Sequence, residues 1–205
     1  MATLLDMRTR IKNALAIQGT EFDTDIDDSI RSALLQYQQE PMWFLEATTT
    51  ITLASGSDSV ALPSDFAQPR WAYVQINGIY RGEKDGSFKR YTFEELEEFC
   101  RQQLVSGSPR AYAYYAGLLY VDVSANADYI IKLNYFKKDE TLPQDDTDTS
   151  VWFNDGYDAI RTLAMAMFKD EVEEYQSAGN DWARADRYLR DLRKRNTQYQ
   201  LGGFS

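Results

Sequence analysis

The segment from Ser108 to Phe136 reads SPRAYAYYAGLLYVDVSANADYIIKLNYF, and it predicts three successive strands joined by two tight turns. Ala116-Gly117 suits the first turn, because glycine adopts a positive φ without strain. In the third strand the alternate residues are large and apolar: Tyr129, Ile131, Leu133 and Tyr135. A sheet with one apolar face must be covered, so the remaining apolar residues are expected to cover it or pair with it.

Helical periodicity lies on both sides of this β region. Apolar residues at helical spacing predict an N-terminal hairpin of helices over 4–18 and 24–40. Thr3 and Asp6 suit the start of the first helix, and Thr24 and Asp27 repeat the pattern at the second. At the other end, helices are expected over 153–175 and 181–195, with Gly179-Asn180 between them.

The central region carries further strand signals. Alternating residues predict a strand over 47–53 and an antiparallel return at 60–62. Asn77-Gly78 is a strong signal for a second hairpin. Between the two halves of the β region, Thr92 and Glu95 form a capping box for a short helix over 93–104, which is expected to bury Phe93, Leu96, Phe99 and Cys100.

The order of these elements predicts an α+β chain. Its N- and C-terminal helix pairs form one helical bundle, and an antiparallel β domain carrying one short helix is inserted between them. The expected parts are an N-terminal helix pair (1–45), the β domain (46–140), an acidic solvated linker (141–151), a C-terminal helix pair (152–195) and a structureless C-terminal docking tail (196–205).

The composition argues against catalysis. The 205 residues include no histidine and one cysteine, so the commonest general base and metal ligand is missing and no internal disulfide is possible. Cys100 lies on an apolar helix face, where a buried hydrophobe is the favoured interpretation. We therefore expect no enzyme activity, no cofactor and no metal.

Two acidic clusters imitate functional sites. Asp23–Asp27 resembles the start of a calcium loop, but Asp28 stands where that loop requires glycine and Leu34 where it requires glutamate. Helix capping explains these acids better. The glutamates of 94–98 suggest a carboxylate pair, but on a short amphipathic helix they are expected to form a solvated face.

Charge and hydropathy limit the partners. With 22 basic and 32 acidic residues, the net charge of −10 repels nucleic acid, although a negative wall lets DNA pass without sticking. No apolar run approaches the ~20 residues that a membrane helix needs, and the N-terminus lacks the centre of a signal peptide. A soluble protein made in a cytoplasm is expected, with no membrane partner.

The C-terminal residues are the candidate binding site. Arg193, Lys194 and Arg195 form a basic turn suited to an acidic protein surface. The tail beyond them alternates polar residues with Thr197, Tyr199 and Leu201, and ends in Gly202-Gly203-Phe204-Ser205. Two interpretations remain open: a frayed terminus, or an extended peptide that becomes ordered on a partner, with Tyr199, Leu201 and Phe204 in pockets.

A family resemblance rests on five stretches taken in chain order: Trp43-Phe44-Leu45 before a threonine-rich strand, Leu62-Pro63-Ser64-Asp65-Phe66, Tyr114–Val121, Leu133–Phe136 before an acidic segment with Leu142, and the alanine-rich helix from Asp155 to Tyr175. In this arrangement the chain resembles the head-to-tail adaptor (connector) proteins of tailed bacteriophages. One departure is Asp122-Val123-Ser124, where relatives often carry prolines.

The resemblance implies a virion protein at the head–tail junction. Such adaptors form a closed homo-oligomeric ring, usually of twelve copies, beneath the portal. The ring joins the capsid vertex to the tail and surrounds the DNA channel without sequence-specific DNA binding or catalysis. The implied partners are the portal protein, reached by the C-terminal segment, and tail or nozzle proteins.

Two alternatives from other classes remain. One is a tail-completion or tail-terminator ring that contacts the tail tube. The other is a β-sandwich module that binds a small ligand or sugar on an aromatic platform of Tyr112, Tyr114 and Tyr120.

Overall fold

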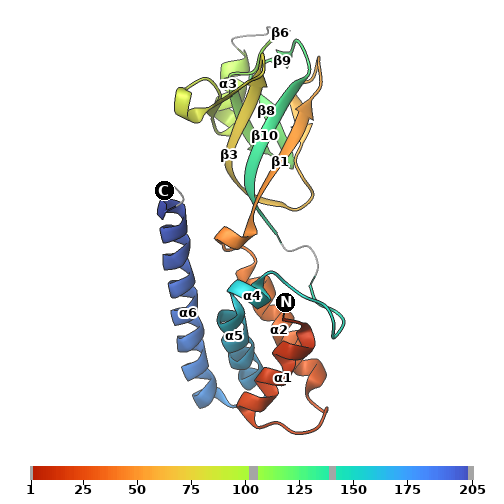
Figure 1. Ribbon diagram of the computed structural model, residues 1–205, viewed down its shortest axis with the longest axis vertical. Coiled ribbons are helices and arrows are strands. Elements are labelled where there is room, and N and C mark those ends of the chain that lie inside the picture. The colour runs from red at the N-terminus through yellow and green to blue at the C-terminus, as the bar shows by residue number, and fades with distance from the viewer. Residues whose placement is uncertain (1, 102–105, 139–141, 203–205) are drawn as a thin grey trace. The chain divides into compact units, whose positions relative to one another are not determined.

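The computed structural model describes residues 2–101, 106–138 and 142–202 and divides the chain into two compact units. Unit 1 comprises Met1–Leu45 and Lys138–Ser205, and unit 2 comprises Glu46–Lys137. Helices lie at both ends of the chain with the β region between them (Figure 1), which confirms the predicted α+β class.

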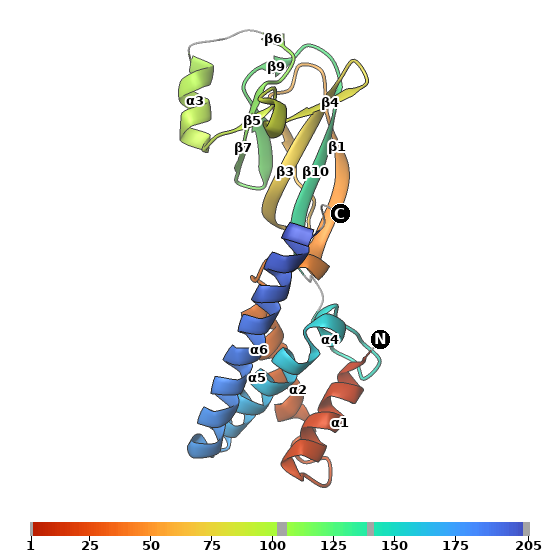
Figure 2. The ribbon, with the colours of Figure 1, turned by 60° about the vertical axis from the view of Figure 1, so that its left-hand side comes forward.

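Unit 1 is helical. Its elements are α1 (Leu4–Leu15), α2 (Asp23–Tyr37), the 3-10 turn η1 (Trp43–Leu45), α4 (Trp152–Asp155), α5 (Tyr157–Glu171) and α6 (Tyr175–Gly202). Figure 2 shows α5 between α6 on one side and α1 and α2 on the other. The apolar stripes meet in a core in which Ile11, Ile30, Ile160 and Leu163 are almost wholly buried. The stripes from both ends of the chain therefore share one bundle.

The helix starts follow sequence rules only in part. Thr3 Oγ1 accepts a hydrogen bond from Asp6 N at 3.2 Å, and the Asp6 carboxylate accepts from Thr3 N at 3.0 Å, as the capping pattern predicts. The predicted second cap is wrong. Helix α2 begins at Asp23, so Thr24 and Asp27 lie inside it, and the Asp27 carboxylate accepts instead from the Arg8 guanidinium at 2.8 and 3.0 Å.

The C-terminal helices break at other places than expected. Gly156 separates α4 from α5, and this position needs a glycine because a side chain there would overlap the fully buried ring of Trp152. Gly179 does not end a helix. The chain turns earlier, at Glu173 with φ 63°, and α6 continues through Gly179. The neighbouring Ala178 is buried, and such packing outweighs the ~1 kcal/mol cost of a helical glycine.

The acidic segment before α4 is exposed over residues 144–147, as expected, but it is also attached to unit 1. Of the expected linker, residue 141 lies outside the described residues. In the rest, Thr149 forms a β-bridge with Thr3, and the Arg8 guanidinium binds the Asp146 carboxylate. Arg31 Nε donates to the Pro143 carbonyl at 2.8 Å. Acidic side chains and backbone carbonyls of this segment thus bind arginines of α1 and α2.

Unit 2 is a β-sandwich with one helix. Its elements are β1 (Glu46–Leu53), β2 (Ser59–Ala61), β3 (Phe66–Ile76), β4 (Ile79–Gly82), η2 (Glu83–Asp85), β5 (Lys89–Arg90), α3 (Phe93–Arg101), β6 (Ser106–Gly107), β7 (Ala111–Tyr115), β8 (Leu118–Val121), β9 (Ser124–Ala125) and β10 (Tyr129–Lys137). One sheet, here called the β10 sheet, has the order β1-β10-β3-β4. The other, the β7 sheet, has the order β2-β8-β7-β5.

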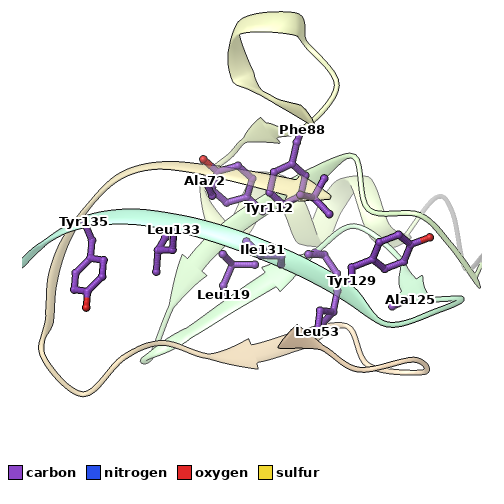
Figure 3. Close-up of a cluster of buried hydrophobic side chains, with 12 residues drawn as sticks. Leu53, Ala72, Phe88, Tyr112, Leu119, Ala125, Tyr129, Ile131, Leu133 and Tyr135 are labelled. Carbon is purple, nitrogen blue, oxygen red and sulfur yellow. The ribbon is translucent and has the colours of Figure 1, made fainter. Parts of the chain in front are cut away.

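The core lies between the two sheets. Tyr112 and Leu119 from the β7 sheet meet Ile131 and Leu133 from the β10 sheet (Figure 3). All four side chains are fully buried. Figure 3 also shows Phe88 next to Tyr112, and the two rings stack at 4.5 Å. The alternate apolar residues of the third predicted strand, Tyr129, Ile131, Leu133 and Tyr135, are therefore the ones that pack in this core.

The predicted three-stranded meander is wrong for its last strand. β7 and β8 form a hairpin around Ala116 and Gly117, whose φ angles of 49° and 78° are both positive. The chain then crosses to the other sheet, where β10 pairs with β1 and β3. Asp122 directly follows β8, where the chain leaves the β7 sheet. Its buried carboxylate accepts hydrogen bonds from the backbone N–H groups of Arg110 and Ala111 at 2.8 and 3.0 Å.

The predicted pairing of the first two strands is also wrong. β2 pairs with β8, whereas β1 pairs with β10, so the loop between them joins the two sheets. Asn77-Gly78 forms the expected hairpin between β3 and β4, with φ angles of 51° and 78°. Local turn chemistry decides a hairpin, but it does not decide which sheet a strand joins.

Helix α3 covers the outer side of the β7 sheet. Leu96 packs against Ala111 and Ala113, whose small side chains leave room for the helix, while Tyr112 between them points into the core. The capping box of Thr92 and Glu95 is present, with N···O distances of 2.9 and 3.2 Å. Phe99 differs from expectation: it is 37% exposed, and its ring stacks on Tyr91.

Gly82 in β4 permits a close packing contact with β3. The two strands pair Gly82 with Tyr73, and a Cβ at Gly82 would overlap the Tyr73 ring. The absence of a side chain lets the ring lie across the neighbouring strand.

We expect Gly82→Ala to lower the free energy of unfolding by about 1–3 kcal/mol, because the methyl group displaces the ring. Urea denaturation measures this change. Gly107→Ala is the matched control, since no atom of the described residues lies within 4 Å of a Cβ there, and its effect should stay within ~0.5 kcal/mol. In a Tyr73→Ala background the Gly82 penalty should shrink. An undiminished penalty in that background would contradict the steric explanation.

Candidate docking surfaces

The predicted binding residues lie on a helix rather than on an extended tail. α6 continues to Gly202, so the expectation of a structureless tail from residue 196 is wrong for residues 196–202. The 28 residues of α6 span ~42 Å, whereas the 15 residues of its neighbour α5 span ~22 Å. About a dozen residues of α6 therefore need another support.

The chain from Glu40 to Trp43 supplies this support. The Arg193 guanidinium donates two hydrogen bonds to the Glu40 carboxylate, at 3.0 and 2.6 Å, and this partner raises the pKa of Arg193. Asn196 Nδ2 donates to the Pro41 carbonyl at 2.7 Å, and the Tyr199 ring lies 6.3 Å from that of Trp43. Sequence reasoning missed these contacts because about 155 positions separate the partners and no periodicity links them.

The predicted site residues whose side chains are described consequently divide into two groups. Arg193 is paired within unit 1 and helps to hold α6. Lys194 is 77% exposed at its side chain, with Asp191 at 3.6 Å, and Arg195 is exposed as well. Leu201 lies in α6, but its side chain is outside the described residues, as is the whole of Phe204. We call the exposed group of Lys194, Arg195 and Tyr199 the α6 docking face.

The α6 docking face has the chemistry of a protein contact. Two exposed cations beside a half-exposed tyrosine suit an acidic partner surface, on which Tyr199 contributes apolar area and a hydroxyl group. Exposed charges of this kind contribute mainly to specificity and association rate.

The acids of the calcium-like stretch interact with cations of the chain. Asp23 lies 2.5 Å from Lys12 Nζ and 3.7 Å from the Arg8 guanidinium, which also binds Asp27. Within residues 2–101, 106–138 and 142–202, no three acidic or thiol side chains are grouped as metal ligands. In the same residues, no helix combines the length and hydropathy that a membrane crossing requires.

The three tyrosines proposed as a ligand platform do not share a face. Tyr112 is fully buried, and its hydroxyl donates to Glu83 Oε1 at 3.0 Å. Tyr114 packs on Phe66 on the same inner side, and burial raises the pKa of both phenols. Tyr120 lies on the outer side against Phe93. This arrangement removes the geometric basis of the sugar-binding alternative.

Cys100 lies on α3 in an apolar setting, where it is half-buried and not fully buried as expected. It lines a pocket of about 290 Å³ together with Phe93, Leu96 and Tyr120. Its thiol donates to the Asp122 carbonyl at 3.4 Å, and burial, aided by nearby carboxylates, raises its pKa. A raised pKa suits a packing residue and not a nucleophile at neutral pH.

One comparison with known proteins gives a family. The family model described as SU10 adaptor protein matches residues 2–203, which covers both units. No curated protein matches the chain in sequence.

We expect Glu40→Ala to loosen the end of α6. Amides of residues 194–202 should exchange hydrogen faster, whereas the melting temperature should change little, because an exposed ion pair contributes less than ~1 kcal/mol. The matched control is Asp186→Ala, which removes the exposed pair with Arg190 on the same helix. Unchanged exchange in Glu40→Ala would show that the Glu40–Arg193 pair does not hold α6.

Cys100 should react slowly with iodoacetamide at neutral pH. Because folding raises the pKa of the thiol, the folded chain holds less thiolate, and the midpoint of its rate–pH profile should lie above that of the urea-unfolded chain. With one cysteine in the sequence, mass spectrometry follows this reaction without interference. Equal rates in the folded and unfolded chains would contradict the assignment of Cys100 as a half-buried packing residue.

Proposed function

The chain belongs to the SU10 adaptor protein family, and we propose on this basis that it forms a closed ring beneath the portal of a tailed bacteriophage. The family is one of bacteriophage structural proteins that act in virus assembly. In the proposed role, the ring joins the capsid vertex to the tail and surrounds the DNA channel. The observation that carries the proposal is the match over residues 2–203, since it includes the helical unit and the β unit alike.

The charge of the chain supports a position beside a DNA channel. A net charge of −10 disfavours binding to the phosphate backbone, so DNA passing a ring of such subunits is repelled rather than retained. The proposed ring therefore guides DNA without reading its sequence. An adaptor of this kind needs no catalytic residues, and we assign none.

The α6 docking face is proposed to contact the portal. Lys194 and Arg195 are exposed on the part of α6 that extends beyond α5, and they locally reverse the acidic character of the chain. The Glu40–Arg193 pair holds this part of the helix, so the face is ordered before the partner arrives and less conformational entropy is lost on binding. The docking segment that we propose is therefore helical and not extended.

We expect the double variant Lys194→Glu/Arg195→Glu to lose co-sedimentation with portal rings at physiological salt, while the free protein keeps its melting temperature. The reason is that both reversals act on exposed charges, which add little to folding stability. Arg187→Glu/Arg190→Glu, on the same helix nearer its N-terminus, is the control with equal net charge. Undiminished portal binding by the first variant, or equal loss by both, would contradict the assignment of this face.

Portal binding as such is tested with the unmodified protein. If it binds tail tubes but no portal rings, the tail-completion alternative replaces the portal adaptor. If it binds neither and electron microscopy finds no ring in assembled particles, the proposed function is wrong.

A further inference from the structure

The outer side of the β10 sheet is an uncovered face of unit 2. Strand register places Ile130, Lys132, Tyr73 and Tyr80 on this side, because the intervening Ile131 and Val74 point into the core. No described element of unit 2 lies over it. Ile130 is 41% exposed and Tyr80 is 43% exposed. We call this surface the open face, and it also includes Trp71 and Thr50.

The composition of the open face differs from that of the whole chain. Aromatic rings cluster on it, since Trp71 and Tyr73 meet edge-to-face at 4.9 Å and Lys132 Nζ lies 6.0 Å from the centre of the Tyr80 ring. The one acidic residue at its strand positions is Glu46 at the end, which pairs with Arg70. Among the described residues its centre therefore carries one positive charge and aromatic surface, the pattern of an interface core.

The opposite side of unit 2 has the complementary character. Phe93, Leu96 and Cys100 face the β7 sheet, so Glu94 and Glu98 point away from it, one helical turn apart. Exposed rings lie beside them: Phe99, and Tyr115, which is 52% exposed and stacks on Phe93 at 4.3 Å. We call Glu94, Glu98, Phe99 and Tyr115 the α3 face.

The layer order puts these two faces on opposite sides of the same unit. Figure 2 shows α3, then β7, then β3 and β10, and the contacts agree, because α3 packs on the outer side of the β7 sheet. Two different, complementary patches on opposite sides are what a head-to-tail contact between identical subunits requires, and such contacts form a ring when the rotation between neighbouring copies closes. A two-fold dimer would instead need one self-complementary patch.

We propose that the open face of one copy binds the α3 face of the next copy, so that unit 2 builds the circumference of the ring. Lys132 meets the glutamates of the neighbouring α3, and the aromatic rings of the two faces pack around this charge contact. This inference rests on the proposed ring function, and it names the surfaces through which the ring closes.

Cross-linking tests the geometry. In the full chain with Cys100→Ala, Lys132→Cys and Glu98→Cys are combined, and a short flexible bismaleimide is added with and without portal rings. The two positions lie on opposite sides of one unit, separated by two sheets and a helix, so a linker cannot join them within that unit. We expect a ladder of covalent dimers, trimers and larger products. Each single-cysteine variant should give monomers, because its reactive position has no equivalent neighbour.

A charge exchange tests the chemistry. Lys132→Glu should raise the concentration for half-maximal assembly by about tenfold, as removal of a close interfacial charge pair does. Glu98→Lys should do the same, and the double variant should recover most of the loss. Arg187→Glu, which changes an exposed charge of unit 1 outside all the proposed faces, is the matched control and should leave self-assembly unchanged.

Several results would overturn the proposal. Covalent dimers from the Lys132→Cys single variant would show a two-fold contact. Protection of that cysteine from maleimide in the dilute monomer would show that unit 1 of the same chain covers the open face. Rings that form without any Lys132→Cys to Glu98→Cys product would leave the adaptor function standing but place the ring contact elsewhere. The absence of rings under every condition would remove the proposed function as well.

Discussion

Unit 1 depends on the guanidinium group of Arg8. This one side chain binds Asp27 in the second helix and Asp146 in the segment that returns from the β region, and it lies 3.7 Å from Asp23. The Arg8 side chain is largely buried, and the carboxylates around it balance its positive charge there. Arg8 thereby joins three stretches of chain, one of which comes from beyond the whole β unit. Hydrophobic packing supplies most of the stability, whereas this cluster fixes how the two ends of the chain meet.

Sequence patterns predicted the elements better than their partners. The α+β class, the capping boxes at Thr3 and Thr92 and the Asn77-Gly78 hairpin are confirmed, because each depends on residues a few positions apart. Sheet membership was missed for β2 and β10, since alternation shows that a strand has a buried face but not which strand lies beside it. The helix end predicted at Gly179 was wrong for a similar reason, because a helix stop signal is a local preference that tertiary packing can override.

The candidate site shows the same limit. The basic residues at 193–195 are visible in the sequence, but the role of each depends on partners about 150 positions away. Glu40 pairs with Arg193 and so helps to support the segment that was expected to be a structureless tail. Lys194 and Arg195 remain exposed and available to a partner. Long-range pairs of this kind leave no periodic trace. The complementary faces of unit 2 likewise could not be predicted from the sequence, because they are defined by the order of the layers and not by any motif.

The insertion of unit 2 into unit 1 affects the order in which the chain folds during translation. Helices α1 and α2 leave the ribosome first, but the partners that bury Ile11 and Ile30 follow only after residues 46–137 have been made. Two exposed apolar stripes must therefore wait while the sandwich is synthesised. If the sandwich folds in this interval, it holds residues 46 and 136 side by side. The connection between the two halves of unit 1 is then effectively short, which lowers the entropy cost of closing the bundle. The β unit then acts as an internal scaffold for the domain that surrounds it in sequence.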